Sequence, residues 1–337
     1  MTWLSGLGAS SPVVAAPMAG GPTTPALVLA AARTGSLGFL AGGYLGAAAL
    51  QDQVASVRAG TDLFGVNLFA PNPVPVDPAA YAAYRDLIRA EADRYAVELP
   101  DDPIEDDDAW RDKIDVLLEH PVPVVSFTFG IPDAASLAAL RDVGTLLVQT
   151  VTSVEEAGAA VDAGVEAVAV QAAGAGGHSG TLTPDRVPPD RPLTALVSEI
   201  RAAVALPILA AGGLASAEDV AAVLAAGADA AVVGTVLLLA DESGASAAHR
   251  AGLLDHSRET AVMRAWTGRP ARGLRNAFSD AYDAVAPTGY PAVHHLTRPL
   301  RRAAASAADP ERVNLWSGTG FRAARQAPVS EILRGLA

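Results

Sequence analysis

The stretch Ser153–Val168, SVEEAGAAVDAGVEAV, contains one complete pattern of a helix followed by a strand. Ser153 precedes two acidic residues, a typical helix start, because a hydroxyl caps free N–H groups and carboxylates complement the helix dipole. Gly164 marks the end of the helix, and an apolar run follows. The stretch Ser216–Ala231, SAEDVAAVLAAGADAA, repeats this order. The repetition favours a barrel of similar β/α units over a single Rossmann sheet.

Short apolar runs recur on both sides of these two units, with Ala-rich helical stretches between them. The runs are nearly continuous in apolar residues, which is typical of strands covered on both faces. Together they predict a (β/α)8 TIM barrel with a smaller, mainly helical lid lobe. The predicted strands are Val13–Pro17, Leu37–Leu40, Phe64–Phe69, Val122–Phe129, Leu146–Thr150, Ala167–Gln171, Pro207–Ala211 and Ala230–Thr235.

Three parts of the chain are expected from this pattern. Residues 1–240 form the barrel, with a helical insertion at about 71–120; residues 241–309 form a helical lid or substrate lobe; and residues 310–337 return to the barrel. The insertion carries the acidic run Glu105–Asp108, which we interpret as a solvated helix start rather than a metal site.

Composition excludes several classes of function. Half of the 337 residues are apolar and 18% are charged, as in a globular protein, and the net charge of −13 disfavours nucleic acid and anionic lipid as partners. The absence of cysteine excludes disulfides, thiolate metal sites and cysteine nucleophiles. The first residues lack a signal-peptide pattern and no run is long enough to span a bilayer, so we expect a cytoplasmic protein. We also expect a monomer or homodimer that acts on a small molecule.

The loop after the sixth predicted strand, Gln171-Ala-Ala-Gly-Ala-Gly-Gly-His178-Ser-Gly180, is the main candidate for chemistry. Active sites of such barrels lie where strands meet their following loops, and His178 exchanges protons near neutral pH. The alternative is a glycine turn that His178 merely caps. The position in a glycine-rich loop at a strand end favours a catalytic histidine.

The next two loops carry glycines that suggest a phosphate site. Gly212 and Gly213 follow the seventh strand, and Gly234 with Thr235 ends the eighth. Barrels often bind phosphate between these loops, because free N–H groups and a helix dipole converge there. The alternative is close packing that only glycine permits.

Other candidates are weaker. Met18 in the first loop and Asn67 on the third strand are suited to a flat heterocycle, yet both also suit ordinary core or turn positions. The motif beginning at Trp316 suits either a ring system or a helix end. His294-His295 is expected in an exposed turn rather than at a metal, and Arg264, Arg269, Arg272 and Arg275 are expected to pack the lid or meet acidic neighbours, with anion binding as the minor alternative.

Six motifs together resemble the nitronate monooxygenase family, formerly called 2-nitropropane dioxygenases, in its class I-like branch. The resemblance spans nearly the whole chain in the right order. The motifs are Ala16-Pro-Met-Ala-Gly-Gly21, Leu37-Gly-Phe-Leu-Ala-Gly-Gly-Tyr44, Phe64-Gly-Val-Asn67, Gln171…Gly-Gly-His178-Ser-Gly180, Ala210-Ala-Gly-Gly213 and Trp316-Ser-Gly-Thr-Gly320.

The resemblance implies a TIM-barrel flavoprotein that uses FMN and O₂ to oxidise alkyl nitronates to a carbonyl compound and nitrite. It implies that His178 is catalytic. From the residues themselves, no metal site is expected. The implied flavin contacts are Met18, Asn67, Gln171, Gly176, Gly212, Gly213, Gly234 and Thr235.

The sequence departs from the family pattern at several positions. Ala172 and Gly174 replace a Gly and a Glu beside the catalytic loop, Ala15-Ala16 stands where Gln-Ala is common, and Thr319 stands where Gln is common. These changes bear on the identity of the substrate more than on the binding of FMN. Two alternatives therefore stay open: an NADH-dependent flavin enoyl-thioester reductase, which shares the barrel and the Gly-Gly-His loop, and a non-catalytic flavin- or phosphate-binding barrel.

Overall fold

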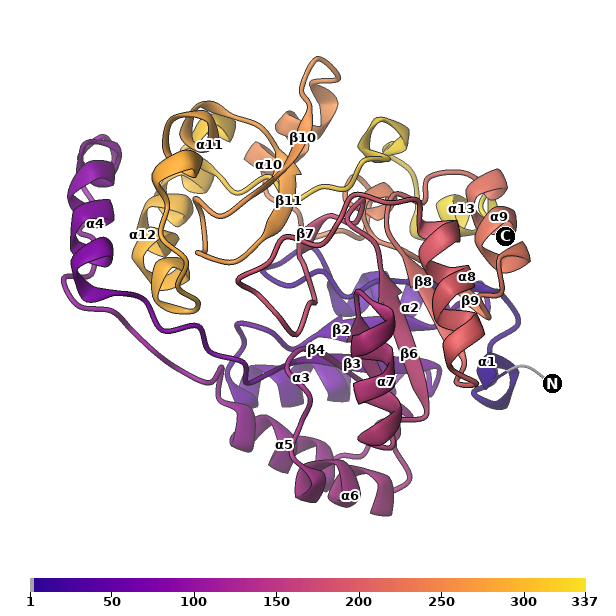
Figure 1. The fold of residues 1–337 in the computed structure, drawn as a ribbon. Helices are drawn as coiled ribbons and strands as arrows, with labels where there is room; N and C mark the ends of the chain where they lie inside the picture. The colour runs from indigo at the N-terminus through magenta and orange to yellow at the C-terminus, as the bar shows by residue number, and fades with distance from the viewer. Residues whose placement is uncertain (1–2) are drawn as a thin grey trace.

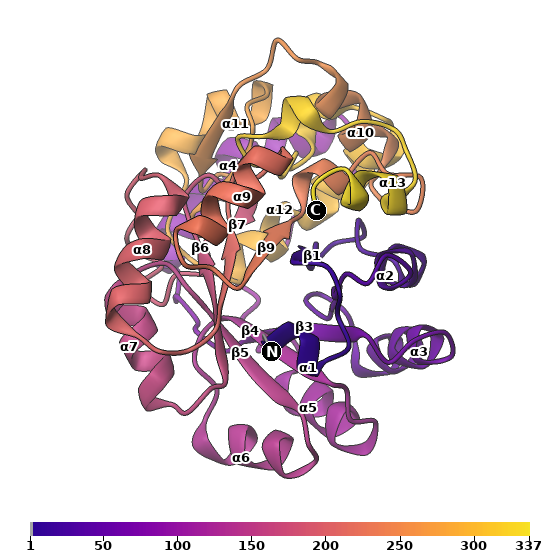
Figure 2. The same cartoon turned by 90° about the vertical axis from the view of Figure 1, so that its right-hand side faces the viewer.

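The computed structural model describes residues 3–337 and contains a closed barrel of eight parallel strands in the order β1-β2-β3-β4-β5-β6-β8-β9. All eight predicted strands are confirmed, and their ends move by at most two residues. Figure 2 shows the helices ranged around the outside of the barrel, as in a TIM barrel. The barrel strands are β1 Val13–Ala15, β2 Gly38–Ala41, β3 Phe64–Ala70, β4 Val124–Phe129, β5 Leu146–Val151, β6 Ala167–Gln171, β8 Ile208–Ala211 and β9 Ala230–Val233.

Helices connect these strands with the expected capping chemistry. The Ser153 hydroxyl accepts a hydrogen bond from the Glu156 N–H, and Ser216 forms a capping box with Asp219. The short helix α1 lies at Trp3–Gly6, and the helices of the outer layer are α2 Pro25–Ala32, α3 Ala47–Arg58, α5 Trp110–Glu119, α6 Ala134–Asp142, α7 Val154–Asp162, α8 Leu193–Ala203, α9 Ala217–Ala225 and α13 Val329–Arg334.

Two apolar cores hold the barrel together. Successive residues of a strand point to opposite faces. Val124 therefore points into the barrel and joins an apolar cluster to which most of the strands contribute. Val125 points outward and joins the larger cluster between strands and helices. Both side chains are completely buried. The double coverage explains why the strands are continuously apolar.

A lobe with its own core covers one end of the barrel (Figure 1). The insertion helix α4, Pro78–Asp93, packs beside α12, Ala292–Ser306, while α5 returns to the barrel layer. The lobe is less helical than the sequence suggested, because β10 (Thr260–Met263) and β11 (Ala271–Leu274) pair with the short strand β7 (Gly177–His178). Its other helices are α10 Ala247–Leu254 and α11 Ala277–Tyr282, and single 3-10 turns lie at Thr235–Leu237, Asp283–Val285, Pro310–Arg312 and Phe321–Ala323.

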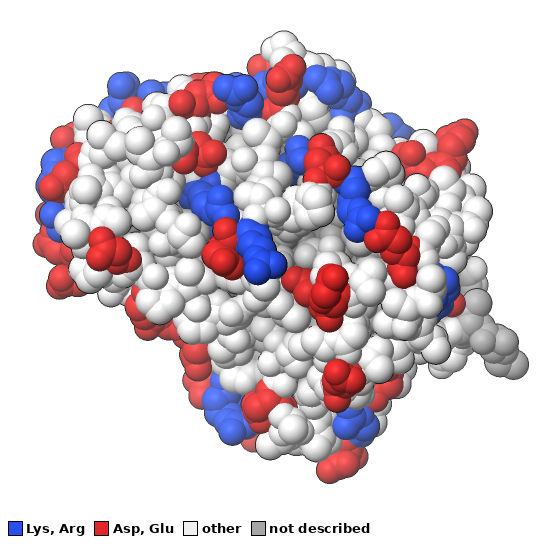
Figure 3. All heavy atoms as spheres, viewed as in Figure 1, with Lys and Arg blue, Asp and Glu red and all other residues white. Residues whose placement is uncertain are grey.

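Neither the barrel nor the lobe, over residues 3–337, contains a helix long and apolar enough to cross a bilayer. On the face seen in Figure 3, acidic and basic side chains are interspersed, and no continuous basic surface covers it.

Candidate functional site

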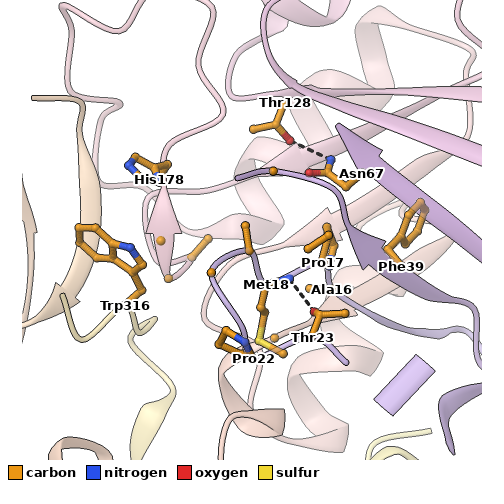
Figure 4. A pocket seen from close by; sticks show the side chains of 18 of the residues that line it. Ala16, Pro17, Met18, Pro22, Thr23, Phe39, Asn67, Thr128, His178 and Trp316 are labelled. Carbon is orange, nitrogen blue, oxygen red and sulfur yellow. Dashed lines mark hydrogen bonds between the residues drawn. The ribbon is translucent and has the colours of Figure 1, made fainter. Parts of the chain in front are cut away.

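A cavity of about 730 Å³ lies where the barrel strands meet the lobe, within the size range of ligand sites. The strand-end loops of the barrel and helix α12 of the lobe both line it. Figure 4 shows Met18, Asn67, His178 and Trp316 around this space. All nine candidate residues line it, namely Met18, Asn67, Gln171, Gly176, His178, Gly212, Gly213, Gly234 and Thr235.

The His178 ring stands in an aromatic surround. Its centroid lies 5.7 Å from Phe129, 5.7 Å from Tyr290 and 5.4 Å from Trp316. Its Nε2 lies 2.9 Å from the Thr267 hydroxyl. Burial, with a smaller effect from nearby arginines, lowers the pKa of His178 to about 3. His178 is therefore neutral at pH 7.

The Gln171 side chain holds the His178 loop in place. Its Oε1 accepts a 2.7 Å hydrogen bond from the Gly180 N–H, and its Nε2 donates to the His178 carbonyl at 3.2 Å. Both ends of the amide are thus engaged by the chain itself. Gln171 lines the cavity and shapes it through these two bonds.

Asn67 presents an acceptor to the cavity. Its Nδ2 donates to Ser126 Oγ at 2.9 Å and to Thr128 Oγ1 at 3.0 Å, the second bond being drawn in Figure 4. Its Oδ1 has no partner within residues 3–337 and is not sealed from the cavity. An acceptor on the barrel floor suits an N–H group of a flat heterocycle.

The first loop is closed by the Thr23 hydroxyl, which accepts a 2.8 Å hydrogen bond from the Met18 N–H (Figure 4). The Met18 side chain lies beside the end of the last barrel strand. A Cβ placed on Gly234 would lie 3.6 Å from the Met18 sulfur. Met18 and Gly234 therefore form one continuous wall.

The glycine pairs form a cradle with free donors. Gly212 and Gly213 have φ angles of +132° and +80°, which side chains rarely adopt. In the described part of the chain, the N–H groups of Gly213, Gly234 and Thr235 donate to no other group. Free N–H groups that converge on one cavity suit a phosphate.

The C-terminal segment closes this cradle. The Gly318 N–H donates to Thr235 Oγ1 at 2.9 Å, and the Thr319 N–H donates to the Gly174 carbonyl at 3.0 Å. A Cβ on Gly176 would come within 2.5 Å of the Gly318 nitrogen, so only glycine allows this approach. The motif that begins at Trp316 is thereby part of the cavity wall.

The prediction that His294 and His295 lie in an exposed turn is wrong. His294 is only 4% exposed, lines the cavity from α12 and stacks on Tyr44 with centroids 4.2 Å apart. His295, the next residue on the helix, points elsewhere, and its Nε2 lies 2.8 Å from Asp106. Burial lowers the pKa of His294 well below its usual value. The sequence of α12 is strongly amphipathic, and this pattern could have revealed that one face of the helix points inward.

Arginines of α12 were also missed as cavity residues. Arg298, Arg301 and Arg302 all line the cavity, and none forms an ion pair within residues 3–337. Burial lowers the pKa of Arg301 only to about 10, which is still well above 7, so Arg301 is charged at pH 7. Arg269 is fully buried with its guanidinium over the Phe129 ring, and it donates to the Thr181 carbonyl. The site is therefore positively charged, although the whole chain is acidic.

The other lid arginines behave as predicted. Arg275 pairs with Asp280 at 2.8 Å, and Arg272 donates to the carbonyl of Ala173 and to Thr260. Arg264 donates to the Asp185 carbonyl at 3.2 Å. Arg264 and Arg272 thus connect the lobe to the loop after β6, and Arg275 forms an exposed ion pair within the lobe.

The acidic run after α4 is not simply solvated. Asp108 and the completely buried Lys113 form an ion pair at 2.6 Å, and Asp108 also accepts a hydrogen bond from the Tyr44 N–H. Glu105, Asp106 and Asp107 are exposed, as predicted, and only Asp108 is half-buried. Its contact with the Tyr44 loop joins distant segments, so the local sequence did not reveal it. Residues 3–337 contain no group of three or more His, Asp or Glu residues arranged to hold a metal.

Comparisons with known proteins agree with this arrangement. The family model "Nitronate monooxygenase" matches residues 2–337. A Staphylococcus aureus (strain MRSA252) protein described as "Probable nitronate monooxygenase" is 33% identical over 331 residues, covering 96% of this chain and 93% of its own.

Two solved structures are also similar. Nitroalkane oxidase from Streptomyces ansochromogenes is 43% identical, with a TM-score of 0.93, and the alignment covers 99% of this chain and 96% of that one. FabK from Thermotoga maritima is 25% identical, with a TM-score of 0.76 and coverage of 100% and 94%. From the match to the family model and the relatives above 30% identity, we conclude that the chain belongs to the nitronate monooxygenase family.

Proposed function

We propose that this chain binds FMN and oxidises alkyl nitronates, or nitroalkanes converted to nitronates in the site, with O₂ to a carbonyl compound and nitrite. One observation carries the proposal: a neutral histidine and a cradle of free N–H groups line the same positively charged cavity. The name of the nitroalkane oxidase from Streptomyces ansochromogenes supports the substrate class. On this proposal the enzyme acts in the cytoplasm as a monomer or homodimer, and its partners are the substrate and O₂.

The residues of the cavity fit FMN at both ends. Gly213, Gly234 and Thr235 would hold the phosphate through their free N–H groups, while the Asn67 Oδ1 would accept from the flavin ring. Met18 would lie against the ring system. When bound, FMN supplies the electron transfer and the reaction with O₂, and the chain supplies position and electrostatics.

The charges of the cavity favour an anionic substrate. Arg301 lines the cavity and Arg269 is buried in the lobe, and neither charged side chain has a carboxylate within ion-pairing distance among the described residues. A nitronate carries one negative charge on its nitro oxygens and compensates this positive field, whereas the parent nitroalkane is neutral. The site therefore stabilises the nitronate whether it binds as such or forms there.

His178 is suited to proton chemistry at this site. Because it stays neutral at pH 7, one ring nitrogen has a lone pair that can accept the acidic α-proton of a nitroalkane, and the other carries an N–H. The burial that lowers its pKa makes it a weak base, and the negative charge that develops on the substrate as the proton leaves raises this pKa again. We expect His178→Asn to retain FMN but to lose about a hundredfold or more in kcat/KM for neutral nitroalkanes, the contribution typical of a general base. Unchanged turnover would remove His178 from the chemistry.

The test of the proposal is an anaerobic absorption spectrum of the FMN-reconstituted protein, recorded with ethylnitronate and, separately, with NADH. We expect the flavin bands to bleach, or to pass to a one-electron form, with the nitronate. A fast response to NADH alone would instead indicate an enoyl-thioester reductase like the FabK type. A protein that binds no FMN would contradict both enzyme functions and favour a non-catalytic barrel.

A further inference from the structure

Thr267 provides a hydrogen-bond partner for the His178 ring. The Thr267 hydroxyl lies 2.9 Å from His178 Nε2, and no other group within residues 3–337 hydrogen-bonds to either ring nitrogen. Nδ1 is also not sealed off from the cavity that His178 lines. The two nitrogens therefore have different surroundings: Nε2 faces the lobe and Nδ1 remains free for a ligand.

The fold holds Thr267 firmly at this position. Thr267 is 1% exposed and lies in the turn between β10 and β11. β11 pairs with β7 so that Ala271 stands opposite His178. The turn itself needs Gly268, whose φ is +72° and where a Cβ would come within 2.5 Å of the Gly289 carbonyl oxygen. The backbone of this turn is therefore fixed next to the His178 ring.

The hydrogen bonds of Thr267 select one tautomer of His178. The hydroxyl has one hydrogen, and its possible acceptors are His178 Nε2 and the Arg269 carbonyl, 3.4 Å away. The Arg269 carbonyl has no other donor in the described part of the chain. Both contacts are satisfied together only if Nε2–H donates to Oγ1 and the hydroxyl donates to the carbonyl.

We propose that Thr267 is a positioning residue that keeps hydrogen on His178 Nε2, so that Nδ1 is the atom that receives the substrate's α-proton. This inference rests on the proposed function and names the reacting atom. In the step, the α C–H bond of the nitroalkane breaks, its electron pair stays on the substrate as the nitronate, and the proton forms a new N–H bond at Nδ1. A nitronate supplied as such needs no proton transfer.

Two variants separate positioning from structure. Thr267→Val keeps the shape and removes the hydroxyl, whereas Thr267→Ser keeps the hydroxyl and serves as the matched control. We expect Thr267→Val to lower kcat/KM for nitroethane by about tenfold or more, and kcat/KM for ethylnitronate by less than about twofold. Thr267→Ser is expected to restore the nitroethane reaction. Equal losses with both substrates, or no rescue by serine, would overturn the positioning role.

Nitrogen NMR of protein with isotope-labelled histidines tests the tautomer without relying on activity. The His178→Asn variant identifies the signal of His178, because that signal is missing from its spectrum. We expect the wild type to carry hydrogen on Nε2, and Thr267→Val to shift toward the other tautomer. Hydrogen on Nδ1 in the wild type would overturn the inference, even if Thr267→Val fails to fold. A protein that oxidises neither substrate but shows Nε2–H would contradict the proposed function and leave the tautomer assignment supported.

Discussion

At the scale of single residues, Gly213 is the clearest test of the phosphate cradle. Its φ of +80° and the 2.7 Å from an added Cβ to Thr319 Oγ1 mean that alanine would be strained and would crowd a free N–H. We expect Gly213→Ala to weaken FMN binding by about tenfold or more, roughly 1.4 kcal/mol, in a titration followed by flavin fluorescence. Gly144→Ala is the matched control, because Gly144 has a similar φ of +87° and open space around its Cβ position. Equal FMN affinity of the two variants would place the phosphate elsewhere.

At the scale of elements, α12 contributes charge to the site as well as packing. Arg298, Arg301 and Arg302 follow a spacing of three and four residues, so they share one side of the helix, where like charges repel unless an anion is near. We expect Arg302→Gln to lower kcat/KM for a nitronate by roughly threefold to tenfold at low salt, and by less at high salt, because ions screen exposed charges. The measurement is the nitronate reaction at two ionic strengths.

The control for α12 is Arg334→Gln on α13. Arg334 is an exposed arginine that forms no ion pair in the described chain and does not line the cavity. The same loss in both variants would indicate a general effect of net charge. A loss confined to Arg302→Gln would support a local role of α12.

The ion pair beneath the Tyr44 loop is another element-scale feature. Lys113 on α5 is 1% exposed and neutralises Asp108, whose carboxylate also holds the Tyr44 N–H. Removing one partner leaves an uncompensated buried charge. We expect Lys113→Ala to lower the free energy of unfolding by about 3 kcal/mol, measured by urea denaturation. The double variant with Asp108→Asn is expected to recover part of that loss, and no recovery would show that the pair is not coupled.

At the scale of the whole molecule, buried neutral histidines make stability depend on pH. Burial lowers the pKa of His249 to about 4, and its Nε2 lies 3.0 Å from the Trp316 carbonyl. The unfolded chain takes up this proton below about pH 6.5, whereas the folded chain does not. The free energy of unfolding therefore falls as the pH drops from about 6.5 toward 4, by up to about 1.4 kcal/mol per pH unit for each such histidine. His294 adds to this slope in the same direction.

Thermal or urea unfolding between pH 7 and pH 5 measures this slope. His249→Gln is expected to flatten it. A slope that is the same in the wild type and the variant would show that other groups control acid stability.

The sequence determined the parts of this protein that depend on local chemistry. Continuous apolar runs, capping residues and glycines with positive φ act within a few neighbouring residues, so the eight strands and the glycine-rich loops were predictable. Because the carboxyl ends of barrel strands meet at one face, the residues at those ends, such as Asn67, His178 and Gly213, were expected to lie together.

Only the tertiary structure decided what surrounds these residues. Thr267 contacts His178 from a position 89 residues later, and His294 reaches the cavity because α12 packs against α4 from the insertion. The neutrality of His178 follows from burial, which also lowers the pKa of Arg301, and both effects depend on how the lobe covers the barrel. The pattern of α12 could have revealed its inward face, but not which side chains of the barrel that face meets. The contact between Thr267 and His178 leaves no local pattern, because it joins two distant segments of the chain.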